Sequence, residues 1–501
     1  MNFINDKINK IILIIILCFT FSCANVNKWR NPASDKINQD LRSMIEELSE
    51  VVQENVTTTE QCHEGLTYYY NKLFQMTSED VKWDILDDEI IERLIKASFE
   101  SRLIIKEKLK KLTLKSEMDH KCLDAVKNSF RALRYVEDYL IEIKAFNTEN
   151  IINIKSKKYI NLTGEGSYFL KNSQFVFNSY HDLKSGDVIL SRGNAYSSAA
   201  IARIGNNDMQ FSHLSFVYID ENGKAWTTEA HIEIGSVVAP IETHIEQGNS
   251  RSVVFRYKNQ ELAHQASKYM FMKVQKQQMN KKNIQYDFAM NYKDDERIFC
   301  SETIHAGFKA VSNGEIDVPR YKTKFNKGLT GFLQVLGIEI NEDNFESFDT
   351  FAPGDIQFDP DFEMVAEWRN PNKMSDSRVK DMILTKMFDW MENLNYKLDP
   401  KFNTSVMSRA SWLLRRTPLI KEFFKDKFPI NMSSAQLRLF IVLDKVGDTL
   451  KAKIEANQKL MKRPMAPIEM FKLLDKYREV DYLIWKKRKA DRPEFHKLFH
   501  P

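Results

Sequence analysis

The sequence predicts an α+β protein, in which a central domain with an antiparallel sheet lies between an N-terminal helical bundle and a C-terminal helical region. Three patterns support this fold class. Apolar residues recur every three or four positions in the first third of the chain, short apolar runs broken by turn residues follow from about residue 159, and helical spacing returns after residue 351. A chain of 501 residues also exceeds the usual size of one hydrophobic core, so we expect several folded units.

The first 22 residues have the pattern of an export signal. Lys7 and Lys10 precede an apolar run at 11–19, which is too short to span a bilayer as a helix. The run ends close to Ser22-Cys23, which resembles the end of a bacterial lipobox although Thr20 and Phe21 depart from it. We therefore expect residues 1–22 to be a lipoprotein-type signal peptide, Cys23 to be the lipidation site, and the mature protein to be membrane-anchored in the cell envelope.

Charge excludes one class of partner. The chain has 73 Lys and Arg against 69 Asp and Glu, a formal net charge of +4, and no block of like charge stands out. This pattern argues against a nucleic-acid-binding protein and indicates no particular protein partner.

A helical bundle is predicted over residues 37–146. Its first helix shows the spacing clearly, with apolar Leu41, Met44, Ile45 and Leu48 on one face. Short connections imply antiparallel neighbours, so the second and fourth helices should run parallel.

Cysteine usage predicts one disulfide in this bundle. If Cys18 leaves with the signal and Cys23 carries lipid, only Cys62, Cys122 and Cys300 remain. Cys62 and Cys122 fall near the starts of the two parallel helices, at the same end of the bundle, where a disulfide is geometrically allowed and export favours it. The alternative is a pair of buried inert thiols.

The central domain is expected over 159–340 and the helical C-terminal region over 351–501. Strands are predicted at 187–190, 211–220, 225–234 and 252–257, and amphipathic helices near 379–394, 434–457 and 468–483. Gly354-Asp355-Ile356 repeats the pattern of Gly186-Asp187-Val188, but no His or Cys follows it, so we interpret it as a turn.

Cys300 is the candidate nucleophile. Ile304, Phe308 and Val311 follow helical spacing, which places Cys300 at or just before a helix N-terminus. The helix dipole and unpaired N–H groups there are expected to lower the thiol pKa, and the Cys300 N–H can donate to an oxyanion. Taken alone, a cysteine in this position is more often a small buried apolar residue.

His213 is the candidate general base. It shares a strand face with Phe211, Val217 and Ile219, so its imidazole points to a buried side and needs a polar partner. Taken alone, it is more often a core histidine bonded to the backbone.

Glu229 is the candidate partner of His213, and the register of the hairpin decides its role. A two-residue Asn-Gly turn would place Glu229 on the face opposite His213. A three-residue loop at 221–223, with Gly223 left-handed, would pair His213 with His231 and bring Glu229 diagonally within reach. A solvated surface carboxylate is the alternative.

Five motifs in one order resemble a known family. They are Leu183-Lys184-Ser185-Gly186-Asp187-Val188, Phe211-Ser212-His213, Glu229-Ala230, Tyr286-Asp287-Phe288 and Phe299-Cys300-Ser301-Glu302. Together they resemble the permuted papain-like cysteine hydrolases of the YaeF/YiiX type, relatives of NlpC-type cell-wall amidases. In that family the His-bearing hairpin precedes the Cys-bearing helix. The resemblance covers about a quarter of the chain and does not extend to the helical flanks.

The resemblance implies a role for each site residue. Cys300 would be the nucleophile, His213 the general base and then acid, and Glu229 the group that orients the imidazole, with His231 as the alternative. Tyr286 would be a pocket wall, whereas Asp187 and Asp287 are more often structural. No metal or other cofactor is required by this chemistry.

The substrate expected from the family and the envelope location is an amide bond in cell-wall peptides. Two alternatives stay open. One is a lipid-directed acyl hydrolase or acyltransferase, because lecithin:retinol acyltransferase-like proteins share the permuted fold; their orienting group is a second His about a dozen residues on, where this chain has Ala225 and Trp226. The other is a non-catalytic envelope lipoprotein that uses the fold for binding.

Overall fold

The structure is a computed structural model, and it describes residues 41–56, 58–81, 87–147, 169–246, 249–293, 296–415, 417, 432–487 and 493–501. The predicted signal peptide at 1–22, the lipidation site Cys23 and the expected starts of the bundle and the central domain lie outside these residues. Within the described residues, no helix is long and apolar enough to cross a membrane.

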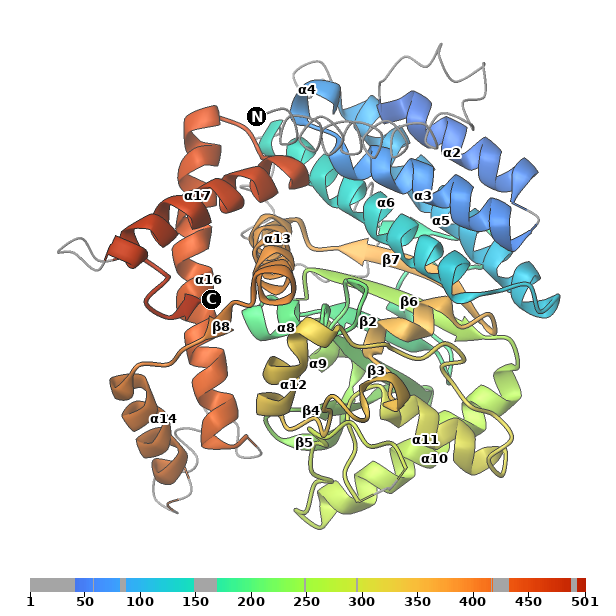
Figure 1. Cartoon of the computed structure of the whole chain (residues 1–501). Coiled ribbons are helices and arrows are strands. Elements are labelled where there is room, and N and C mark those ends of the chain that lie inside the picture. Colours follow the sequence, from blue (N-terminus) through green and yellow to red (C-terminus); the bar gives the residue numbers. More distant parts are fainter. Residues whose placement is uncertain are drawn as a thin grey trace, which may run out of the picture.

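Four long helices form the N-terminal bundle: α2 (Leu41–Asn55), α3 (Thr59–Gln75), α5 (Asp88–Leu114) and α6 (His120–Asn147), with a short α4 (Ser78–Val81) between them (Figure 1). Thr58 and Asp87 begin α3 and α5 by accepting hydrogen bonds from the backbone N–H groups of Gln61 and Ile90. A disulfide joins Cys62 of α3 to Cys122 of α6, whose Cα atoms lie 5.4 Å apart. It ties together the starts of these two helices.

A seven-stranded antiparallel sheet forms the centre of the molecule, in the order β1-β7-β6-β2-β3-β4-β5. The strands are β1 (Phe169–Lys171), β2 (Val188–Arg192), β3 (His213–Ile219), β4 (Ala225–His231), β5 (Gly235–Pro240), β6 (Arg251–Tyr257) and β7 (Phe362–Arg369). The helices of this part are α8 (Tyr196–Ile201), α9 (Ile241–Glu246), α10 (Gln260–Met279), α11 (Glu302–Val311) and α12 (Thr330–Leu336). Both α10 and α11 pack on β3 and β4 (Figure 1).

One sequence assignment is wrong. Residues 362–369 were placed in the helical C-terminal region, but they form β7, which pairs with β6 and β1 inside the sheet. Seven of the eight residues of β7 are buried. The segment does carry a strand pattern, since apolar Phe362, Met364, Ala366 and Trp368 alternate with polar Glu363, Glu367 and Arg369, and the buried charges among them are neutralised by ion pairs with the bundle.

The C-terminal region is otherwise helical. It contains α13 (Pro371–Leu394), α14 (Phe402–Leu414), α16 (Ser434–Met461) and α17 (Pro467–Lys487), with a small pair of strands, β8 (Lys397–Leu398) and β9 (Phe499–His500). α13 packs on α6 of the bundle, α8 of the central part, and both α16 and α17. The predicted turn at Gly354 is a buried 3-10 helix, Pro353–Phe358.

A buried network of charges joins the bundle to the sheet. Arg102 of α5 donates to Glu137 of α6 at 2.8 Å and to Glu367 of β7 at 2.5 Å, and all three side chains are fully buried. Arg369 of β7 pairs with Glu137 and, at 2.8 Å, with Asp138. Because each charge has a partner, the network can lie in the interior without an isolated ion.

Candidate active site

The hairpin of β3 and β4 places His213 and Glu229 on one face. Phe216 pairs with Thr228 and Ile219 with Ala225, which leaves a three-residue loop at 221–223. Gly223 closes this loop with a φ of 76°, a left-handed conformation that glycine adopts without strain. The observed register is the one predicted for the three-residue loop.

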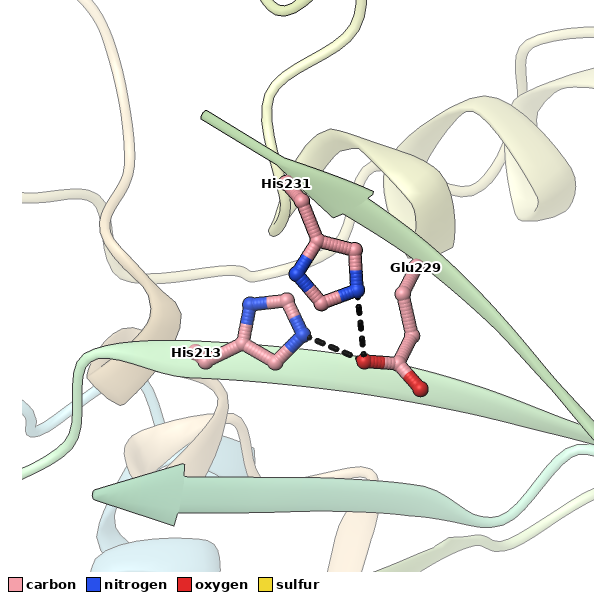
Figure 2. A group of neighbouring side chains, drawn as sticks. All are labelled: His213, Glu229 and His231. Carbon is pink, nitrogen blue, oxygen red and sulfur yellow. Dashed lines mark hydrogen bonds and ion pairs between the residues drawn. The ribbon is translucent and has the colours of Figure 1, made fainter. Parts of the chain in front are cut away.

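Glu229 is the centre of a buried polar cluster (Figure 2). Its Oε2 atom lies 2.8 Å from Nε2 of His213 and 3.2 Å from Nε2 of His231. Its Oε1 atom accepts a hydrogen bond from the Thr227 hydroxyl at 2.6 Å and lies 3.2 Å from Nδ1 of His244. The carboxylate is therefore held from both sides, and it directs Nε2 of His213 inward.

The cluster keeps Glu229 ionised. Burial would raise its pKa, but the charge of His244 and hydrogen bonds from the three histidines outweigh burial and hold the pKa well below its usual range. The pKa of His213 is lowered from its ordinary value because burial exceeds the opposing effect of Glu229. The pKa of His231 is raised, because there the hydrogen bond and charge of Glu229 prevail over burial. His213 is thus neutral at pH 7 and able to accept a proton.

His244 was missed by the sequence analysis. It lies on α9, between β5 and β6, and also contacts the Ser215 hydroxyl at 3.1 Å. Nothing in Pro240-Ile241-Glu242-Thr243-His244 marks it as a site residue. Only the packing of α9 beside β4 brings it to Glu229.

Cys300 lies one residue before Ser301, the N-cap of α11, and is a free, buried thiol. Tyr286, expected as a pocket wall, lines the same cavity as this thiol.

The expectation of a lowered thiol pKa is wrong. Burial raises the pKa of Cys300 to about 11, despite the polar groups of Tyr286 and Ser301, which act in the opposite direction. The helix N-terminus does not compensate for the loss of solvent around the sulfur. Cys300 is therefore a neutral thiol at pH 7 and needs a base to become nucleophilic.

The structure brings His213, Glu229 and His231 together but shows no hydrogen bond between His213 and Cys300. No described residue hydrogen-bonds to Nδ1 of His213, and 18% of its side chain is exposed. Cys300 lines a cavity, and Ile232, the neighbour of His231, lines the same cavity. The end of β4 that carries the histidine cluster therefore adjoins the pocket of the thiol; we call this cavity the Cys300 pocket.

Asp187 and Asp287, the acidic residues of two other motifs, serve the fold. Asp187 is buried and pairs with Arg256 at 2.7 Å. Asp287 accepts hydrogen bonds from the backbone N–H groups of Ala289 and Asn291, which closes the turn after Tyr286. Both roles match the structural interpretation of these residues.

The histidine cluster also has the composition of a metal site. His213, Glu229 and His231 each offer one ligand atom, and these atoms lie within 4.8 Å of one another. In the structure the same groups hydrogen-bond to one another, so binding a cation there would compete with the orientation of His213.

Comparison with known proteins agrees with this arrangement. Residues 182–334 match the model of a family described as permuted papain-like amidase enzymes, YaeF/YiiX, C92 family. The chain carries a permuted papain-like amidase domain. The matched segment contains all three predicted catalytic residues, and the family is one of amide hydrolases.

A search of solved structures finds a weakly similar structure, and a search of curated proteins finds no match. The structure is titled the crystal structure of metalloprotein yiiX from Escherichia coli O157:H7. The likeness covers 37% of this chain and 98% of that chain, with 20% identity and a TM-score of 0.27.

Proposed function

We propose that this protein is a cysteine-dependent amidase in which Cys300 is the nucleophile and His213 the general base. The observation that carries the proposal is a buried thiol at a helix start, in a cavity that the end of β4 adjoins, together with a neutral imidazole on β3 whose Nε2 is held by an ionised carboxylate of β4. This is the arrangement of nucleophile, base and orienting group that nucleophilic catalysis needs.

The reaction begins at a neutral thiol. Nδ1 of His213 accepts the Cys300 proton while the sulfur attacks the carbonyl carbon of the amide, and backbone N–H groups of Cys300 and Ser301 donate to the oxyanion. The imidazolium then gives its proton to the amine, the C–N bond breaks, and a thioester remains. Water, deprotonated by His213, attacks the thioester to release the acid and restore the thiol.

Two further residues support these steps. Glu229 holds the ring of His213 by Nε2 and stabilises the imidazolium that forms. The hydroxyl of Tyr286, which lines the same cavity, donates to the sulfur as the thiolate develops. Catalytic hydrogen bonds are often long without substrate, so we expect Nδ1 of His213 and the sulfur to approach each other in the substrate complex.

The proposal also includes a cellular location and a substrate class. The export signal at 1–22 and lipid on Cys23 would place the enzyme at an envelope membrane, and the family suggests amides of cell-wall peptides. Cys23→Ala should leave the protein soluble or unprocessed on cell fractionation, and a wild-type protein found only in the soluble fraction would contradict the anchor.

A lipid-directed acyl hydrolase is the second candidate. The observation in its favour is the Cys300 pocket, whose lining is almost wholly apolar.

Labelling with an electrophilic cysteine probe tests the mechanism. The wild-type protein should be labelled on Cys300, and Cys300→Ala and His213→Ala should each abolish the thioester intermediate seen by mass spectrometry with peptide and acyl amides. A chelator should leave the rate unchanged. Turnover by Cys300→Ala at the wild-type rate, or loss of turnover on chelation with Cys300 still reactive, would refute a thiol mechanism.

A further inference from the structure

The end of α16 exposes apolar side chains between two lysines. Leu460 is 81% exposed and Met461 is 39% exposed, and Lys459 and Lys462 on either side of them are exposed as well. We call these four residues the α16 corner. Apolar side chains that stand out from the surface with cations beside them have the composition of a contact with a phospholipid interface.

The α16 corner lies beside the end of the helical bundle at which the described chain begins (Figure 1). Pro464 and Ala466, which follow the corner, both contact the bundle. Tyr139, near the end of α6, donates to the Pro464 carbonyl at 3.3 Å. Leu41, the first residue of α2, lines a cavity together with Ala466 and with Leu73 of α3, and α17 packs on α3. The corner therefore adjoins the point at which the chain enters the bundle.

Chain length limits how far the corner can lie from a lipid on Cys23. Residues 24–40 join Cys23 to Leu41, and a segment of this length spans at most about 60 Å when fully extended. The corner needs only part of this reach because it lies beside Leu41. The exposed apolar residues of α14 lie further away, since α14 packs on the other end of α16, where Arg438 donates to Ser405. The 28 residues of α16 span about 42 Å.

We propose that the α16 corner is a membrane-contact site, at which Leu460 and Met461 enter the interface of an anionic phospholipid bilayer while Lys459 and Lys462 contact the headgroup phosphates. The inference rests on the lipid anchor that the proposed function includes. Insertion removes apolar surface from water, and each lysine is attracted by the negative surface. A second copy of the chain fits the corner less well, because a symmetric contact would bring the same lysines together.

This second contact would determine the orientation of the enzyme on the membrane. A lipid on Cys23 limits only the distance from the bilayer, whereas a fixed point on the folded chain also sets which face is turned towards it. Stable attachment commonly combines lipid with a basic or apolar surface.

The test is the insertion of an environment-sensitive fluorophore in the full-length acylated protein. NBD is attached to Leu460→Cys in a Cys300→Ser background, and the unmutated background protein serves as the blank. The protein is reconstituted in vesicles of phosphatidylcholine with phosphatidylglycerol. We expect the NBD emission to rise, to shift to the blue and to be quenched by doxyl-labelled lipid.

Leu114→Cys is the matched control. Leu114 is 76% exposed and precedes the exposed Lys115, so it has the same local chemistry as Leu460. It ends α5 at the opposite end of the bundle, where Thr59, the first residue of α3, donates to the Glu117 carbonyl. NBD at this position should keep the emission that it has in water.

Charge reversal tests the role of the lysines. In the protein labelled at Leu460→Cys, the double change Lys459→Glu and Lys462→Glu should lower the ratio of inserted to free label at least about tenfold. Lys115→Glu should leave this ratio unchanged. Vesicles of phosphatidylcholine alone should have the same effect as the double change.

Three results would overturn the proposal. They are equal emission from labels at 460 and 114, insertion of a label at Leu413 of α14 in place of 460, and a rise at 460 that doxyl-labelled lipid does not quench, which would report contact with a second copy. Mass spectrometry of the mature N-terminus tests the anchor separately. If Cys23 carries no acyl group, the anchor fails, and the same label measured with added vesicles still decides the α16 corner.

Discussion

Glu229 is the residue on which three histidines converge. Its oxygens lie 2.8 to 3.2 Å from ring nitrogens of His213, His231 and His244, and it is almost fully buried. In the proposed mechanism this carboxylate has two roles: it fixes the tautomer of His213, and its charge stabilises the imidazolium.

Replacing this carboxylate should slow the reaction without stopping it. Glu229→Gln keeps a hydrogen-bond acceptor for His213 but loses the charge, so we expect the rate of thioester formation to fall on the order of 10²-fold. His231→Gln should cost less than about tenfold, because His231 contacts the outer side of Glu229. Single-turnover acylation measures both, and equal losses would contradict the primary role of Glu229.

The pH dependence should report the lowered pKa of His213. The base form is present above the pKa, so activity should persist below pH 6.5, the ordinary value for His, and be lost only as the pH falls further. The acid limb of kcat/KM against pH measures this. In Glu229→Gln the limb should move to lower pH, since the carboxylate raises the His213 pKa; a shift to higher pH would contradict the assignment.

The β3–β4 hairpin is the element that aligns the site. A shift of one residue in the pairing of β3 with β4 would turn every side chain of β4 to the other face of the sheet, because side chains alternate with period two. The register of the hairpin therefore determines whether Glu229 reaches His213.

Deletion of Ala225 should abolish activity for this reason. It keeps the three-residue loop but moves each later residue of β4 by one position, so Glu229 would pair with Phe216 and point away from His213. Gly223→Ala is the control: it keeps the loop length, no atom lies within 4 Å of the added Cβ, and the strained φ should cost about 1 kcal/mol of unfolding free energy with activity retained. Activity in the deletion variant comparable with that of Gly223→Ala would contradict the register argument.

At the scale of the whole molecule, buried ion pairs hold the bundle on the sheet. Arg102, Glu137, Glu367 and Arg369 come from α5, α6 and β7, and none of their side chains is accessible to solvent. Removing one member leaves its partners buried and underpaired, which costs more than loss of an exposed pair.

Arg102→Ala should lower the free energy of unfolding by about 3–5 kcal/mol. Arg42→Ala is a matched control in the same bundle, since the Arg42–Glu46 pair is exposed on both sides, and it should change stability by no more than about 1 kcal/mol. Urea denaturation of the two variants measures the difference. Equal effects would show that the buried network does not contribute to docking of the bundle.

The sequence by itself determined what depends on neighbouring residues. A hairpin turn at Gly223, the position of Cys300 just before a helix and the spacing of the bundle helices follow from local backbone preferences and periodicity, whereas the choice between a two-residue and a three-residue loop came from the structure. The order of the His-bearing hairpin and the Cys-bearing helix also follows from the sequence, and so does the resemblance of residues 182–334 to permuted papain-like amidases.

The tertiary structure alone decided what depends on burial and on contacts between distant segments. Cys300 is a neutral thiol because the assembled fold removes water from its sulfur, whatever its place on the helix. His244 reaches Glu229, β7 pairs with β6, and Phe440 closes the pocket through contacts that no local pattern encodes. Desolvation and packing are properties of the folded chain as a whole, so they cannot be inferred from any one stretch of it.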